Sequence, residues 1–132
     1  MRANHRKALL LTCLFACAAL PANAADRMRP GQWVGEWTGG GRTRATSTCV
    51  TQGDADAMNG DAKSVQAYLD KTIPPSICKA TNLKVSASQI AYTAVCTGGK
   101  DNATITTYHG DRFESTDSHG AKSDAKWVGP CK

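Results

Sequence analysis

The clearest chemistry in this sequence of 132 residues lies in four cysteines: Cys49, Cys78, Cys96 and Cys131. They lie 29, 18 and 35 positions apart, whereas structural zinc sites use close pairs such as Cys-x-x-Cys. In an oxidising compartment, cysteines with such wide spacing form disulfide bonds instead. We therefore interpret the four residues as two disulfides, for which the sequence allows three pairings.

The hairpin expected between Cys78 and Cys96 helps to weigh these pairings. If its loop consists of residues 86–88, Cys78 lies directly opposite Cys96, within the Cα distance that a disulfide requires. This register favours a Cys78–Cys96 bond, which leaves Cys49 to pair with Cys131.

A second register of the same hairpin competes with the first. A four-residue loop over 86–89 pairs Val85 with Ile90 and Leu83 with Tyr92, which gives a more coherent apolar face. That register moves the two cysteines apart. A β-bulge would reconcile the two registers, although the loop has no glycine to make one easy.

Acid–base catalysis would depend on His109 or His119. A small hydrolase-like enzyme would combine His109 with a nearby carboxylate, Asp111 or Glu114. Both histidines stand beside glycine turns, so we expect them at strand ends, facing solvent. The sequence contains no Gly-x-Ser-x-Gly, His-Glu-x-x-His or phosphate-loop motif. We therefore predict no catalytic residues, no cofactor and no metal site.

Aromatic residues provide the candidates for a ligand cavity. Period-two alternation places Trp33 and Trp37 on one face of a strand, and a two-residue loop at 110–111 places Tyr108 beside Phe113. Such rings usually belong to a core, but in a curled sheet they would line a pocket for a small apolar ligand. The candidate cavity residues are Trp33, Trp37, Tyr92, Tyr108 and Phe113.

Short alternating segments rich in Thr, Val, Ile and Tyr, separated by small polar turns, predict antiparallel strands. The expected strands span 31–38, 42–50, 79–85, 89–97, 102–109, 111–118 and 122–128. We predict a mainly β (α+β) fold, an antiparallel meander of about six to seven strands curled into a half-barrel with one helix packed on it.

The predicted helix spans 61–71. It begins at an aspartate, which can cap the first turn, and Val65, Tyr68 and Leu69 form an apolar stripe at helical spacing. Pro74-Pro75 ends the helix, because proline forces the preceding residue into an extended conformation.

Residues 1–24 have the pattern of a secretory signal peptide, with basic residues, an apolar run over 8–20 and an Ala-x-Ala site before cleavage after Ala24. The apolar run is too short to span a bilayer. We expect residues 25–132 to form one exported domain, periplasmic or secreted. As an alternative, the segment ending at Cys17 resembles a bacterial lipobox, so that Cys17 would be lipidated and would anchor the protein.

The formal net charge of +5 overstates how basic the exported chain is. Removal of Arg2, Arg6 and Lys7 with the signal leaves 13 basic against 11 acidic side chains. These basic residues are scattered among acids and form no stripe that would follow a phosphate backbone. We therefore exclude nucleic acid as a partner.

Several motifs resemble those of the DUF3617 family of exported bacterial proteins. They are the Pro-Gly-x-Trp start within 28–33, the Cys-x-Thr at 49–51, the cysteines that flank a hairpin at 78 and 96, the segment 108–113 and the Gly-x-Cys end within 127–131. The resemblance covers residues 28–131. The sequence departs from the family's pattern in the segment 121–126, which is short. It implies an exported protein with a cysteine framework, and it implies no activity.

These observations favour an exported periplasmic, non-enzymatic binding or envelope-associated module, stabilised by two disulfides. Its partner would be a small apolar ligand or an envelope protein, with membrane contact only if Cys17 is lipidated. One alternative is the small periplasmic enzyme that uses His109. The other is a structural or assembly protein that pairs through an exposed edge strand, expected near Trp127, although Lys122 and Lys126 argue against that edge.

Overall fold

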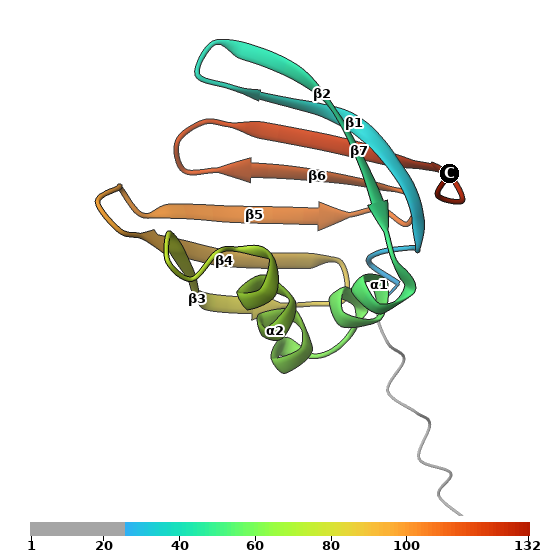
Figure 1. Ribbon diagram of the computed structural model, residues 1–132, viewed down its shortest axis with the longest axis horizontal. Coiled ribbons are helices and arrows are strands. Elements are labelled where there is room, and N and C mark those ends of the chain that lie inside the picture. The colour runs from blue at the N-terminus through green and yellow to red at the C-terminus, as the bar shows by residue number, and fades with distance from the viewer. Residues whose placement is uncertain (1–25) are drawn as a thin grey trace, which may run out of the picture.

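The computed structural model describes residues 26–132, so the predicted signal peptide and Cys17 lie outside the described part of the chain. Seven strands form one antiparallel sheet in the order β2-β1-β7-β6-β5-β4-β3 (Figure 1). The strands are β1 (Gly31–Gly39), β2 (Arg42–Val50), β3 (Cys78–Val85), β4 (Gln89–Cys96), β5 (Asn102–Tyr108), β6 (Arg112–Asp117) and β7 (Lys122–Gly129).

The sheet is open, because its two outer strands β2 and β3 do not pair with each other. From β3 to β7 the chain forms a meander, and the β1–β2 hairpin is added on the β7 side. Figure 1 shows that the sheet curves and that the helices lie on one side of it. The predicted fold class is confirmed, and the strands lie close to their expected ranges.

The β1–β2 hairpin turns on Gly40 and Gly41, which both have positive φ, 56° and 73°. A two-residue loop of this kind matches the twist of the strands, and glycine adopts it without a steric penalty. The two strands then pair in register over their full length, from Gly39↔Arg42 to Gly31↔Val50.

Two helices connect β2 to β3: α1 (Gln52–Asn59) and α2 (Ala62–Thr72). The side chain of Asp61 caps α2 by accepting a hydrogen bond from the backbone N–H of Ser64 at 2.9 Å. The expectation of a single helix was incomplete, because α1 has a weak apolar stripe of only Ala55 and Met58. A Thr51 cap and burial of these two side chains stabilise it.

The core consists of two adjoining clusters. The side chains of Met28 and Phe113 pack against both. The first cluster joins α1 and α2 to the β3 half of the sheet and contains Met58, Val65, Leu69, Ala80, Ile90 and Tyr108. The second lies at the β1–β7 side and contains Trp33, Val50, Ala55 and Ala125.

The β3–β4 hairpin combines both predicted registers. Near its base Cys78 lies opposite Cys96, and near its loop Val85 lies opposite Ile90. The register changes between Thr81 and Lys84, where two residues of β3 face one of β4. Asn82 adopts φ 52° at this bulge, so an asparagine takes the left-handed conformation for which no glycine is present.

Candidate functional site

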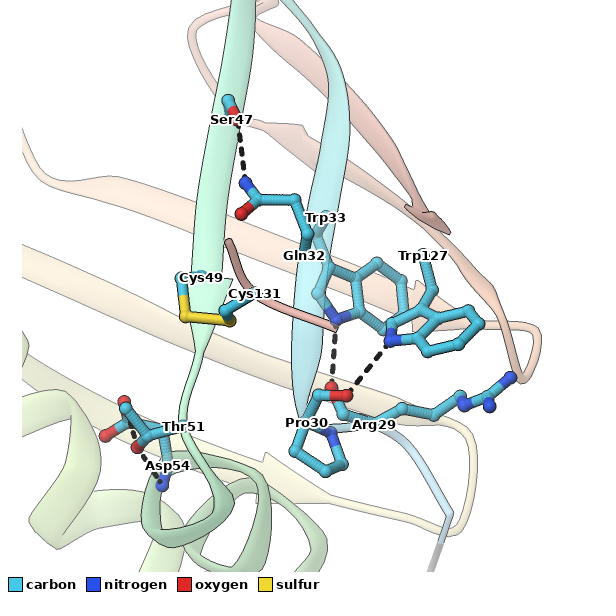
Figure 2. The surroundings of a disulfide bond; sticks show 10 residues. All are labelled: Arg29, Pro30, Gln32, Trp33, Ser47, Cys49, Thr51, Asp54, Trp127 and Cys131. Atoms are coloured by element: carbon cyan, nitrogen blue, oxygen red, sulfur yellow. Dashed lines mark hydrogen bonds between the residues drawn. A yellow bond between two sulfur atoms is a disulfide. The ribbon is translucent and has the colours of Figure 1, made fainter. Parts of the chain in front are cut away.

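Two disulfides stabilise opposite parts of the sheet. Cys78–Cys96 joins the first residue of β3 to the last of β4, with Cα atoms 4.0 Å apart. Cys49–Cys131 joins β2 to the end of the chain, with Cα atoms 5.5 Å apart (Figure 2). This is the pairing that the three-residue loop favours. Two disulfides are consistent with an extracellular or periplasmic environment.

Three of the five candidate cavity residues contact one another in the core. The ring centroid of Phe113 lies 5.6 Å from that of Trp33 and 6.0 Å from that of Tyr108. Trp33 is only 2% exposed, and its indole N–H donates to the carbonyl of Arg29 at 2.9 Å. Burial raises the pKa of the Tyr108 hydroxyl above its ordinary range. These three rings fill space in the core.

The other two candidates lie in different surroundings. Trp37 is half-buried, and the guanidinium carbon of Arg44 lies 4.5 Å from the centre of its ring. Tyr92 is also half-buried and packs against the cluster beneath α2, where burial raises its pKa. The structure therefore does not bring the five rings together around one space.

The candidate acid–base residues lie at the surface. His109 Nε2 lies 3.9 Å from a carboxylate oxygen of Glu114, and the two side chains are 43% and 57% exposed. Arg112 approaches the same carboxylate at 3.6 Å. His119 lies at another turn, where its ring nitrogen Nε2 is 3.0 Å from the carbonyl of Asp101. Within residues 26–132, no group of three His, Cys, Asp or Glu side chains is placed to hold a metal ion.

A buried arginine near the start of the described chain was not predicted. Arg27 is 2% exposed and donates to three backbone carbonyls: Met58 at 2.8 Å, Gly60 at 2.6 Å and Ser86 at 2.5 Å. Burial lowers the pKa of its guanidinium, and the nearby Tyr108 acts in the opposite direction. Arg27 thus joins the end of α1 to the β3–β4 loop. Nothing local in the sequence marks this role, because the three carbonyls meet only in the folded chain.

Hydrogen bonds also attach the segment after Arg27 to the rest of the fold. The backbone N–H of Met28 donates to the Asn59 side chain at 2.8 Å, and the Asn59 amide donates back to the Met28 carbonyl at 2.7 Å. Trp127 donates to the carbonyl of Pro30 at 2.9 Å, and the Arg29 guanidinium carbon lies 3.7 Å from the centre of its ring (Figure 2). The N-terminal segment is therefore part of the fold's framework.

The expected edge near Trp127 is wrong. β7 pairs with β1 on one side and with β6 on the other, so it lies inside the sheet. The strands at the two edges are β2 and β3. Sequence reasoning missed this arrangement because a strand at the end of the chain need not be at the end of the sheet.

The β2 edge is open. Of its nine residues only Val50 is buried, so side chains on both faces of the strand reach solvent. Within the described chain, every backbone hydrogen bond of β2 to another segment is made with β1. The strand contains no lysine, proline or bulge. Its two charged side chains, Arg42 and Arg44, lie at its start, so residues 45–50 have none of the usual devices that block an edge. Residues 45–47 also line a depression of about 570 Å³ beside β1 and β7.

The β3 edge, in contrast, is protected in three ways. Lys79 and Lys84 place charges along it, and the bulge at Asn82 interrupts its pairing pattern. From α2, the side chain of Gln66 donates to the backbone carbonyl of Ala80 at 3.2 Å. Of the two edges, β2 is thus the less protected one, and it is the candidate functional site.

No helix among residues 26–132 is both long and apolar enough to span a membrane.

No curated protein and no solved structure matches the chain. Residues 28–131 match the model of a family described as protein of unknown function, DUF3617. The match covers more than half of the chain, including all seven strands, both helices and all four cysteines of the disulfides. The chain therefore belongs to the DUF3617 family.

Proposed function

We propose that the protein is an exported, non-enzymatic binding module of the cell envelope that engages a protein partner by adding a strand to β2. The observation that carries this proposal is the open edge of β2, a nine-residue strand whose residues 45–50 carry no charge, proline or bulge. An unpaired strand edge presents a row of N–H and C=O groups to which an extended segment can bond.

Export is supported by the signal-like pattern of residues 1–24 and by the two disulfides, which persist in oxidising compartments. A periplasmic location follows from the same pattern, as part of this proposal. The Cys49–Cys131 bond attaches the end of the chain to β2 through a side chain, so it stiffens the strand beside its unpaired backbone edge.

A protein partner is favoured over a small apolar ligand by the position of the aromatic residues. Trp33, Tyr108 and Phe113 contact one another in the core, where they stabilise the fold. An enzyme using His109 is less favoured, because its closest carboxylate, Glu114, is 3.9 Å away and more than half exposed. General acid–base pairs are more effective where burial shifts their pKa.

Site-specific photo-crosslinking tests the proposal. The full-length gene, expressed in a bacterium, would carry a photoreactive amino acid in place of Thr46 on β2 or, as a matched control, Thr81 on β3. Both threonines are half-buried residues of edge strands. We expect a processed, exported protein that gives a discrete protein adduct from position 46 and none from 81. Failure to export, or equal adducts or none at the two positions, would overturn the proposal.

A further inference from the structure

We infer that the strand added to β2 is the β2 strand of a second copy of this chain, in antiparallel orientation about a two-fold axis. This inference rests on the proposed function and names its partner. It follows from the distribution of charges and hydroxyl groups along β2. This distribution makes the strand complementary to an antiparallel second copy of itself.

The charges of β2 lie at one end. Arg42 and Arg44 begin the strand, and residues 45–50 carry no charge. A parallel second copy would place the arginines of both chains side by side, which is destabilising. An antiparallel copy with its axis at Thr46, the midpoint of the strand, places Arg44 opposite Thr48. The arginines of the two copies then lie at opposite ends of the interface.

The residues that follow β2 complete this charge complementarity. Asp54 and Asp56 lie in α1, which begins two residues after the strand ends. Because an antiparallel pair brings the start of one strand to the end of the other, Arg42 and Arg44 of each copy approach the acidic helix of its mate. Asp56 is exposed, and Asp54 is partly exposed.

The side chains in the middle of β2 suit a symmetric strand pair. Thr43, Thr46, Ser47 and Thr48 provide hydroxyl groups on both faces, and cross-strand Thr–Thr and Thr–Ser contacts stabilise antiparallel pairs. The hydroxyl oxygen of Thr43 lies 3.0 Å from that of Thr38 on β1, so a cross-strand Thr–Thr contact already occurs on this strand. The pairing would join two seven-stranded sheets into one continuous sheet.

The β3 edge does not have this self-complementarity. Its lysines lie in both halves of the strand, at Lys79 and Lys84, so an antiparallel second copy would place lysines of the two chains close together. The bulge at Asn82 would also break the ladder near its centre. The inference therefore applies to β2 alone.

Sedimentation equilibrium of the purified, oxidised exported chain tests this inference. From micromolar to millimolar concentration, we expect the measured mass to rise from one copy to two. Thr46→Lys should weaken this association about tenfold or more, because it places two lysines opposite each other at the axis. Thr81→Lys, the matched control on β3, should associate like the wild type. Circular dichroism would verify that both variants fold.

The outcomes separate the inference from the proposed function. A wild-type mass of one copy at all concentrations, or association that T46K does not weaken, overturns the inference. If the chain stays monomeric while position 46 still cross-links to a different protein, the proposed function stands with another partner. If neither association nor cross-linking occurs, both are wrong.

Discussion

The two ends of the sheet differ in how much of each is covered. At the β3 end, α2 packs on the sheet, the core contains Val65, Leu69 and Ile90, and Gln66 occupies an edge carbonyl of the outer strand. At the β2 end, seven of the nine residues of the outer strand are exposed, against three of eight in β3. The outer strand at the β3 end is therefore covered by its own chain, and the one at the β2 end is left largely exposed.

This difference does not come from strand composition. Both outer strands are of similar length and contain Thr, Ala and Val, and each carries two basic residues and one disulfide cysteine. What differs is the placement of the charges, the bulge at Asn82 and the helix beside β3. A few specific features thus protect an edge, and where they are missing the same kind of strand is left able to pair.

Removing each disulfide should have the largest effects and should separate the two ends. The Cys49–Cys131 bond closes a loop of 82 residues and Cys78–Cys96 one of 18. Chain entropy then predicts a loss of about 4–5 kcal/mol for the double serine variant of the first pair and about 3 kcal/mol for the second. Urea unfolding of both variants measures the difference. Equal losses, or the reverse order, would contradict the expectation that the disulfide closing the longer loop contributes more to stability.

Arg27→Met should destabilise the protein by about 2–4 kcal/mol, because the buried carbonyls of Met58, Gly60 and Ser86 lose their donor. Arg29→Met serves as the control. That side chain is exposed and stacks on Trp127, so its loss should cost below about 1 kcal/mol. Chemical denaturation measures both. Similar losses in the two variants would show that the buried arginine does not hold the β3 end to α1.

Stability should fall at alkaline pH because of Tyr108. Burial raises its pKa above the ordinary value of 10.0, so above about pH 10 the unfolded chain releases a proton that the folded chain retains. Below about pH 10 the protonated hydroxyl contributes its full stabilisation. Above that pH the free energy of unfolding decreases by up to about 1.4 kcal/mol per pH unit. Tyr108→Phe should remove most of this slope.

The matched control for this pH effect is Tyr68→Phe, at a half-buried tyrosine of α2 whose pKa is raised less by burial. It should leave most of the alkaline slope in place. The melting temperature as a function of pH measures the slopes. If Tyr108→Phe keeps the wild-type slope, burial in the core beneath α2 does not raise the pKa of this hydroxyl.

The smallest expected effect comes from Gln66→Ala, which removes the hydrogen bond to the Ala80 carbonyl. We expect a loss of about 0.5 kcal/mol, since alanine is the better helix former and offsets part of the lost bond. Amide exchange in β3 should become faster, whereas exchange in β2 should not change. Faster exchange in both strands would show that this contact does not act locally on the β3 edge.

The strands could be predicted from sequence because alternation and glycine turns are local signals, as in the hairpin around Gly40-Gly41. Helix α1 was missed, since Ala55 and Met58 are too few to form a visible stripe. The β3–β4 register stayed ambiguous because a bulge at Asn82 satisfies two competing patterns in turn. A local pattern of apolar residues predicts a single register, so it does not show that the register changes within a hairpin.

The candidate site was less accessible to sequence reasoning. The sequence allows the hypothesis of an exposed edge strand, but which strand lies at the edge depends on the order of the whole sheet. Arg27 likewise acquires its partners from α1 and from the β3–β4 loop. Both features depend on contacts between distant segments, which spacing and composition do not encode.

Hydrogen exchange at dilute and concentrated protein tests most directly whether β2 is the docking edge. Amides that gain a hydrogen bond at an interface exchange more slowly once it forms. We predict that exchange within Arg42–Val50 slows as the concentration rises, whereas exchange within Cys78–Val85 stays the same. Unchanged exchange in β2, or slowing confined to β3, would contradict the pairing of β2 with a second copy.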